Sequence, residues 1–111
     1  VYYMTKDTVY KYLVKTFGGV QYSGVRYLAY LVCNLGEKDR LREHYNKLAE
    51  EYNSTPAAVE RAVRYYLNFI LTQVSLEDLS VMYDYPFSPT TTRLSNRKFI
   101  RILQNALEGN L

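Results

Sequence analysis

Three charged side chains, Glu60, Arg61 and Arg64, lie close together in the sequence, shortly after the stretch Asn-Ser-Thr-Pro at residues 53–56. A guanidinium can donate two hydrogen bonds to O6 and N7 of guanine, and a carboxylate can accept one from N4 of cytosine. On an exposed helix these groups could therefore read base edges in the major groove of DNA. A solvated helix face is the alternative, because a Glu60–Arg64 pair at i, i+4 stabilises a surface helix by about 0.3–0.5 kcal/mol.

Small and polar residues around these charges could hold the DNA backbone. The hydroxyl of Ser54 or Thr55 and the exposed N–H groups at the start of a helix, such as that of Ala57, are suited to a phosphate. Ala57 and Ala58 would also keep the leading turn thin enough for close approach to a groove. Tyr65 would face outward with the charged residues and could reach the same backbone.

A second group of cations, Arg93, Arg97, Lys98 and Arg101, surrounds the expected start of the last helix. They could form a solvated basic face. Alternatively, Arg97 and Lys98 could contact phosphates beside the reading helix, helped by the positive end of their own helix dipole. Both interpretations remain open from the sequence.

No other residues have the types and spacing of a catalytic or metal centre. His44 is the only histidine, and Cys33 is the only cysteine, so neither has partners at ligand spacing. Glu50 and Glu51 are adjacent and would point to different faces of a helix, which makes a poor acid–base pair. The sequence therefore predicts a protein that is not an enzyme, with no cofactor and no metal site.

The elements that must position these residues all have helical periodicity, and no segment alternates like a strand. We expect a single compact all-α domain over residues 1–111, with six helices. Their expected ranges are about 5–17, 23–34, 38–52, 56–73, 75–83 and from 95 onward, with Thr5 or Asp7, Ser23, Thr55, Ser75 and Ser95 as caps. An extended loop is expected over 84–94, where prolines and threonines concentrate.

The segment 38–73 has the spacing of a helix-turn-helix. Ala49 is a small residue where a second helix could cross closely, and Asn53, four residues later, tolerates a positive φ. Val59, six residues further, could point back at the first helix. Pro56 fits the first helical position after a Thr55 cap. This pattern would turn Val59 and Val63 inward and leave the charged residues outward.

Composition fits a soluble intracellular domain. The formal net charge of +3 permits nucleic-acid binding without requiring it. No uncharged run reaches the roughly 20 residues that span a bilayer, and a lone cysteine suits a reducing cytoplasm. We therefore expect a cytoplasmic protein without a membrane partner; the absence of an initial methionine suggests a processed or trimmed chain.

The stretch LAEEYNSTPAAVERAVRYYL, residues 48–67, resembles the helix-turn-helix of the stage-zero sporulation protein A family, the sporulation response regulators of Firmicutes. The likeness extends to FGGVQYSGVRYLAYLV, LEDLSVMYDY and LSNRKFIRILQNAL, so it covers nearly the whole chain. It implies the six-helix, DNA-binding effector domain of that family. The resemblance assigns Glu60 and Arg61 to bases and Arg64 to bases or backbone. It also implies double-stranded DNA as the partner, two copies on tandem sites, and contacts to RNA polymerase.

Two features depart from the family pattern. A base-contacting arginine two residues before the glutamate is Ala58 here, which predicts a loss of about 1–3 kcal/mol of discrimination at one base pair. The family's phosphoacceptor receiver domain has no counterpart in this chain, which leaves open an excised effector domain or a stand-alone relative. A helical protein-interaction module that has lost DNA reading is the alternative function, and Ala58 favours it. So does the excess of acidic side chains over residues 35–79.

Overall fold

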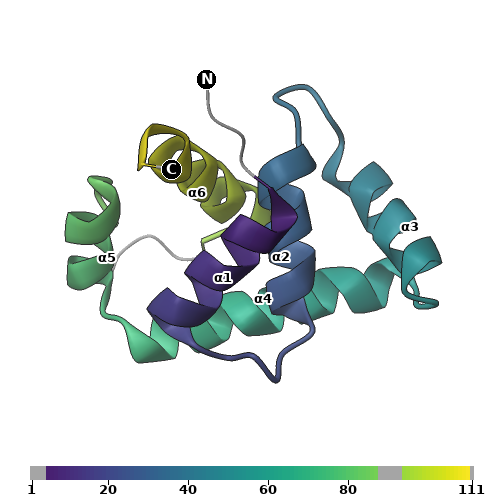
Figure 1. Ribbon diagram of the computed structural model, residues 1–111, viewed down its shortest axis with the longest axis horizontal. Helices are drawn as coiled ribbons and strands as arrows, with labels where there is room; N and C mark the ends of the chain where they lie inside the picture. Colours follow the sequence, from purple (N-terminus) through teal and green to yellow (C-terminus); the bar gives the residue numbers. More distant parts are fainter. Residues whose placement is uncertain (1–4, 88–93, 111) are drawn as a thin grey trace.

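The computed structural model describes residues 5–87 and 94–110, with the side chains of the last two excepted, and these ranges contain six α-helices and no strand (Figure 1). The helices are α1 (Lys6–Phe17), α2 (Gly24–Asn34), α3 (Leu41–Glu51), α4 (Pro56–Gln73), α5 (Leu76–Tyr83) and α6 (Asn96–Asn110). The predicted all-α, six-helix fold is confirmed. The expected loop over 84–94 lies partly outside the described residues, as does Arg93.

Four of the predicted caps form as expected. The side chains of Thr5, Thr55, Ser75 and Ser95 each accept a hydrogen bond from the backbone N–H three residues later. Ser23 precedes α2, but the prediction that its side chain caps the helix is wrong. Its backbone is already helical, with φ −63° and ψ −27°, and the hydroxyl makes no capping bond. A residue in that conformation continues the helix backward instead of turning its side chain onto the first N–H groups.

The third helix begins at Leu41, three residues later than expected. Upstream of it, the N–H of Asp39 bonds the carbonyl of Gly36, and the N–H of Gly36 bonds the Asp39 carboxylate at 2.8 Å. These bonds form a local turn, and Arg40 leaves it in an extended conformation. The turn uses the backbone groups that a longer helix would have needed.

A sharp break separates α3 from α4. Asn53 has φ +52°, the left-handed conformation that the sequence predicts for it. Around it, the N–H of Ser54 bonds the carbonyl of Ala49 at 2.8 Å, and the N–H of Asn53 bonds that of Glu50 at 3.5 Å. This is the Schellman arrangement, which satisfies the last carbonyls of a helix while reversing the chain. The start of α4 is therefore fixed relative to α3 by backbone bonds.

The core is organised around α2, which packs against α1, α4 and α6. Gly24 at its start lies so close to α4 that a Cβ atom there would stand 2.1 Å from the carbonyl oxygen of Ala62. Tyr66 of α4 is fully buried, and its hydroxyl donates to the carbonyl of Gly18 at 2.9 Å. Burial raises the pKa of the Tyr66 hydroxyl. These contacts hold α4 against the first two helices.

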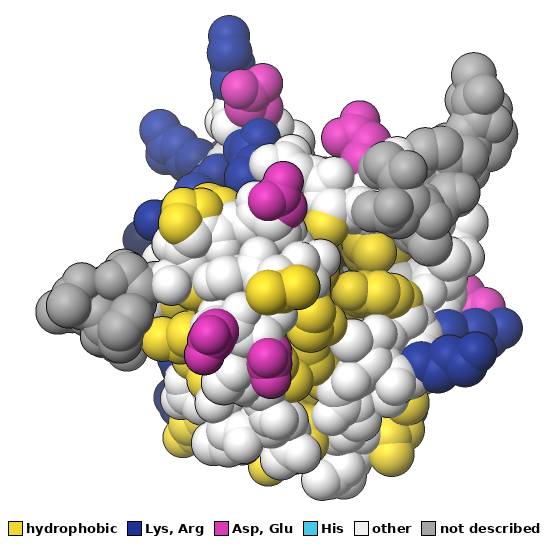
Figure 2. All heavy atoms as spheres, turned by 90° about the vertical axis from the view of Figure 1, so that its left-hand side faces the viewer, with side chains coloured by type: hydrophobic (Ala, Val, Ile, Leu, Met, Phe, Trp, Pro, Cys, Tyr) yellow, Lys and Arg dark blue, Asp and Glu magenta, His cyan; other side chains and the backbone are white. Residues whose placement is uncertain are grey.

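The short helix α5 is attached more loosely, since Leu79 is its only buried residue. A 2.8 Å bond between the hydroxyls of Tyr12 and Tyr83 ties it to α1, and burial raises the pKa of Tyr83. Val81 and Met82 on α5 are exposed, and Figure 2 shows hydrophobic side chains interspersed with acidic ones on this side of the molecule. Among the described helices, none is long and apolar enough to cross a membrane.

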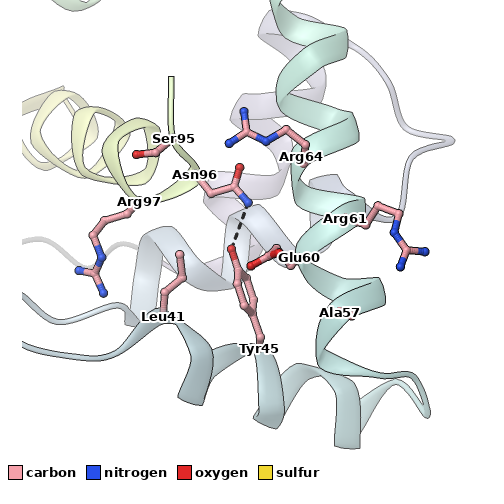
Figure 3. Close-up of a pocket in the computed structure, with 9 residues that line it drawn as sticks. All are labelled: Leu41, Tyr45, Ala57, Glu60, Arg61, Arg64, Ser95, Asn96 and Arg97. Carbon is pink, nitrogen blue, oxygen red and sulfur yellow. Dashed lines mark hydrogen bonds between the residues drawn. The ribbon is translucent and has the colours of Figure 1, made fainter. Parts of the chain in front are cut away.

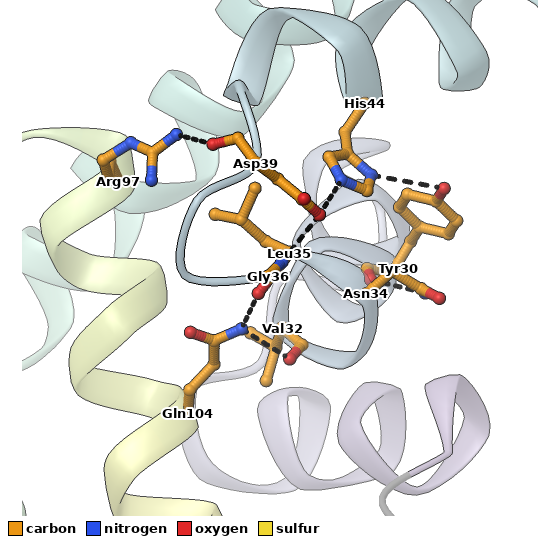
Figure 4. A network of polar contacts seen from close by, with 9 residues as sticks. All are labelled: Tyr30, Val32, Asn34, Leu35, Gly36, Asp39, His44, Arg97 and Gln104. Atoms are coloured by element: carbon orange, nitrogen blue, oxygen red, sulfur yellow. Dashed lines mark hydrogen bonds and ion pairs between the residues drawn. The ribbon is translucent and has the colours of Figure 1, made fainter.

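A polar network ties the loop before α3 to two helices (Figure 4). The carboxylate of Asp39 lies 3.0 Å from Nε2 of His44, and the other ring nitrogen lies 3.4 Å from the hydroxyl of Tyr30. The guanidinium of Arg97 donates to the Asp39 carbonyl at 2.6 Å. Gln104 of α6 donates to two further carbonyls at the end of α2 and in the loop.

The Asp39 carboxyl gives the stability of this loop a pH dependence. The hydrogen bond from His44, and then that from the Gly36 N–H, hold the pKa of Asp39 below its usual range. The ionised form is therefore favoured by folding. Its stabilisation is present above the unfolded pKa of about 3.9 and is lost as pH falls through the lower folded value.

The variant Asp39→Asn should accordingly be less stable than the wild type near pH 7, with the difference shrinking below about pH 4. Urea denaturation over a pH series measures this. Glu37→Gln, in the same loop but without a side-chain hydrogen bond or ion pair to another described residue, is the matched control and should lack the effect. A difference that stays constant down to low pH would contradict the assignment.

Candidate nucleic-acid interface

The first turns of α4 present two charged side chains to solvent. Val59 and Val63 are buried against the core, which turns the intervening Glu60 and Arg61 outward, as the periodicity predicts. Tyr65 is also exposed, with 56% of its surface accessible. The helix thus has an apolar inner face and a charged outer face beginning directly after the break at Asn53.

A groove of about 490 Å³ runs beside this outer face, between α3, α4 and the start of α6 (Figure 3). It is lined by Leu41, Tyr45, Ala57, Glu60, Arg61, Arg64, Ser95, Asn96 and Arg97. The fold therefore brings the charged residues of α4 together with Arg97, which lies more than thirty residues away in sequence. Three arginines and one glutamate are among the residues that line the groove.

Glu60 and Arg61 point in different directions. In Figure 3, Arg61 extends from α4 on the side away from α6, whereas Glu60 points toward Tyr45 and Asn96. Glu60 makes no hydrogen bond or ion pair with any residue that the structure describes, so the i, i+4 pair with Arg64 is not formed. Glu60 is therefore an exposed carboxylate, as both interpretations of this charged face allow.

Arg64 is half-buried, and its Nη1 donates to the carbonyl of Leu94 at 2.8 Å. This bond fixes the guanidinium against the segment that leads into α6. A guanidinium has five N–H donors and can therefore bond more than one acceptor at a time. The sequence contains no signal for this contact, because Leu94 is thirty residues downstream.

Contacts with other segments also hold two of the basic side chains of α6, Arg97 and Lys98, in position. Arg97 is half-buried and donates to the Asp39 carbonyl, whereas Lys98 is exposed, with its Nζ 5.7 Å from the centre of the Tyr85 ring. Arg101 is half-buried. Arg97 therefore lies in the groove with the residues of α4, and Lys98 lies outside its lining.

The leading turn of α4 offers both a hydroxyl and a backbone donor. Thr55 Oγ1 accepts from the N–H of Ala58 at 3.1 Å, while the N–H of Ala57 has no acceptor among the described residues. Ser54, Thr55 and Ala57 are all exposed, and Ala58 is half-buried. A donor that faces solvent at a helix N-terminus is favourable for an anion.

Four of the residues that line the groove were not predicted as site residues from the sequence: Leu41, Tyr45, Ser95 and Asn96. Asn96 is only 8% exposed, and its Nδ2 lies 3.1 Å from the hydroxyl of Tyr45. Burial raises the pKa of Tyr45, and the Asn96 bond opposes this shift. The sequence shows Asn96 only as the first residue of a helix, and a pairing with α3 gives no local signal.

The chain matches the family model described as "Sporulation initiation factor Spo0A C terminal" over residues 9–107. The match begins within α1 and ends within α6, so it spans the whole six-helix arrangement. Comparison with solved structures gave no match. Because the family model covers nearly the entire chain, the protein belongs to the Spo0A C-terminal family, the DNA-binding effector domains of that sporulation regulator.

Proposed function

We propose that this domain regulates transcription by reading a specific DNA sequence with α4 placed in the major groove. The observation that carries the proposal is the pair Glu60 and Arg61, which stand exposed on the first turns of a helix that follows a sharp, backbone-bonded break. In a helix-turn-helix, this end of the second helix contacts base edges. Here α3 and α4 supply the two helices.

The proposed contacts follow from side-chain chemistry. Arg61 bonds a guanine and Glu60 accepts from a cytosine, while Arg64 meets bases or backbone. The backbone contacts are assigned to Ser54, Thr55, Ala57, Tyr65, Arg97 and Lys98, all of which are at least partly exposed. Because Ala58 replaces the family's arginine, one guanine contact is absent, and we expect an operator that differs from the family's.

The wider assembly is proposed from the family likeness. Two copies bind tandem sites on the duplex, with contacts between them through the C-terminal helices, and the bound domain contacts RNA polymerase in the cytoplasm. No catalytic step, cofactor or metal is part of this function.

Arg61→Ala should weaken binding to the cognate sequence by about 1–3 kcal/mol and random duplex much less, because a base contact is removed. Lys98→Ala should weaken both duplexes about equally and lower the slope of log K against log salt by about 0.9, because one phosphate contact is removed. Fluorescence anisotropy over a salt series, with a cognate site selected from a random pool, measures both effects.

Lys15→Ala provides the control, since this exposed cation in the last turn of α1 has no proposed role. The proposal fails if Arg61→Ala and Lys98→Ala both bind DNA as the wild type does. The alternative, a protein-interaction module, predicts no salt-dependent binding even to random duplex at low salt.

A further inference from the structure

The buried side chain of Asn96 leaves one polar atom unsatisfied inside the groove. Its Nδ2 is assigned to the bond with Tyr45, and its Oδ1 is buried without a partner among the described residues. Figure 3 shows the side chain projecting from α6 between Tyr45 and Arg64. A buried polar group without a partner is destabilising, so a hydrogen-bonding partner that enters the groove at this atom would be favourable.

The two ends of an asparagine amide are distinguished only by their partners. A tyrosine hydroxyl can donate as well as accept, so the amide can turn, with Tyr45 donating to Oδ1 and Nδ2 facing the groove. In that orientation Asn96 offers a hydrogen-bond donor to a ligand. The Nδ2 group then has no partner within the described part of the domain, and the ligand must supply a hydrogen-bond acceptor for it.

The groups around Asn96 are also donors. Ser95 caps α6 by accepting from the N–H of Lys98, whereas the N–H groups of Asn96 and Arg97 have no acceptor in the part of the chain described. They stand at the positive end of a helix of 15 residues. Arg64 and Arg97 line the same groove, and Glu60 is the one acidic residue in its lining.

We propose that this groove binds a phosphate group, held by the turned Asn96 amide, the first N–H groups of α6, and the guanidinium groups of Arg64 and Arg97. The inference rests on the proposed function, under which the occupant is a backbone phosphodiester of the bound duplex. Arg64 then contacts the backbone, and sequence is read by Glu60 and Arg61. Asn96 thereby becomes a DNA-contacting residue that the charge pattern does not reveal.

Inorganic phosphate, titrated into the ¹⁵N-labelled domain at constant ionic strength, tests the site directly. The side-chain amide signal of Asn96 and the backbone signal of Arg97 should shift together and saturate. Asn96→Asp should abolish this response, since it places a negative charge in the site. The aspartate can still accept from Tyr45 and suits a helix N-terminus, so the melting temperature should be retained.

Asn105→Asp, the same change at an exposed position of α6, is the matched control and should respond to phosphate as the wild type does. In DNA titrations, Asn96→Asp should weaken cognate and random duplex alike, by about tenfold, with no such loss for Asn105→Asp. Arg64→Gln should likewise affect both duplexes about equally.

The two DNA outcomes separate the sources of the phosphate. If duplex and inorganic phosphate shift the same Asn96 signal, the occupant is a DNA phosphodiester. If phosphate shifts it and duplex does not, the site is a phosphate site for a small phosphorylated compound. The inference is overturned if phosphate leaves the Asn96 signal unshifted, or if Asn96→Asp responds to phosphate and DNA as Asn105→Asp does. DNA binding through Arg61 is tested separately, by the Arg61→Ala variant.

Discussion

Replacing Gly24 with valine is expected to lower the free energy of unfolding by about 3 kcal/mol, one of the largest effects of any single change in this domain. A Cβ atom at this position would stand 2.1 Å from the Ala62 carbonyl oxygen and 2.8 Å from its carbonyl carbon. Both are backbone atoms of α4, so no side chain can rotate to make room. The helices must separate, and the apolar surface between them would be partly exposed.

Urea denaturation followed by circular dichroism measures this loss. Arg26→Ala, two residues along α2 on its exposed face, is the control and should change stability by less than about 0.5 kcal/mol. If Gly24→Val were as stable as Arg26→Ala, the close approach of α2 to α4 would be wrong.

Tyr66→Ala should cost about 3–5 kcal/mol, because the ring is fully buried and its removal leaves a cavity. The ring lies between α4 and the turn after α1, with its centroid 6.0 Å from that of Phe69 and 6.2 Å from that of Tyr22. Its loss would loosen the packing of α4 on the turn after α1. Thermal unfolding should therefore occur at a markedly lower temperature.

Tyr66→Phe distinguishes the contribution of the hydroxyl to stability from that of the ring. It keeps the packing but removes the donor that bonds the Gly18 carbonyl at 2.9 Å and that of Leu13 at 3.4 Å. We expect a smaller loss, about 1–2 kcal/mol, from the unsatisfied carbonyl. Equal losses for the two variants would mean that the hydroxyl, and not the ring, makes the dominant contribution.

Local chemistry explains why much of the fold could be predicted. The bounds of α4 follow from the Thr55 cap, Pro56 at the first turn and the apolar stripe behind Glu60 and Arg61, all of which act within a few residues. Asn53 adopts a positive φ because its short polar side chain tolerates it. The outward placement of the charged residues follows from the same periodicity.

Contacts between distant segments could not be predicted in this way. The bond from Arg64 to Leu94, that from Arg97 to Asp39, and the pairing of Asn96 with Tyr45 all join residues at least thirty apart in sequence. None changes the hydrophobic pattern of its own helix. The late start of α3 has a similar cause, because the turn at Asp39 is held by His44 and Arg97 as well as by local bonds.

The glycine contact between α2 and α4 has a consequence for how a duplex would be recognised. A helix pressed backbone to backbone against its neighbour cannot slide or roll to follow a groove of unfavourable width. If α4 lies in the major groove, the DNA must therefore change its own shape to fit the helix. We expect preferred operators to contain easily deformed steps, such as TA or CA, at positions that no side chain touches.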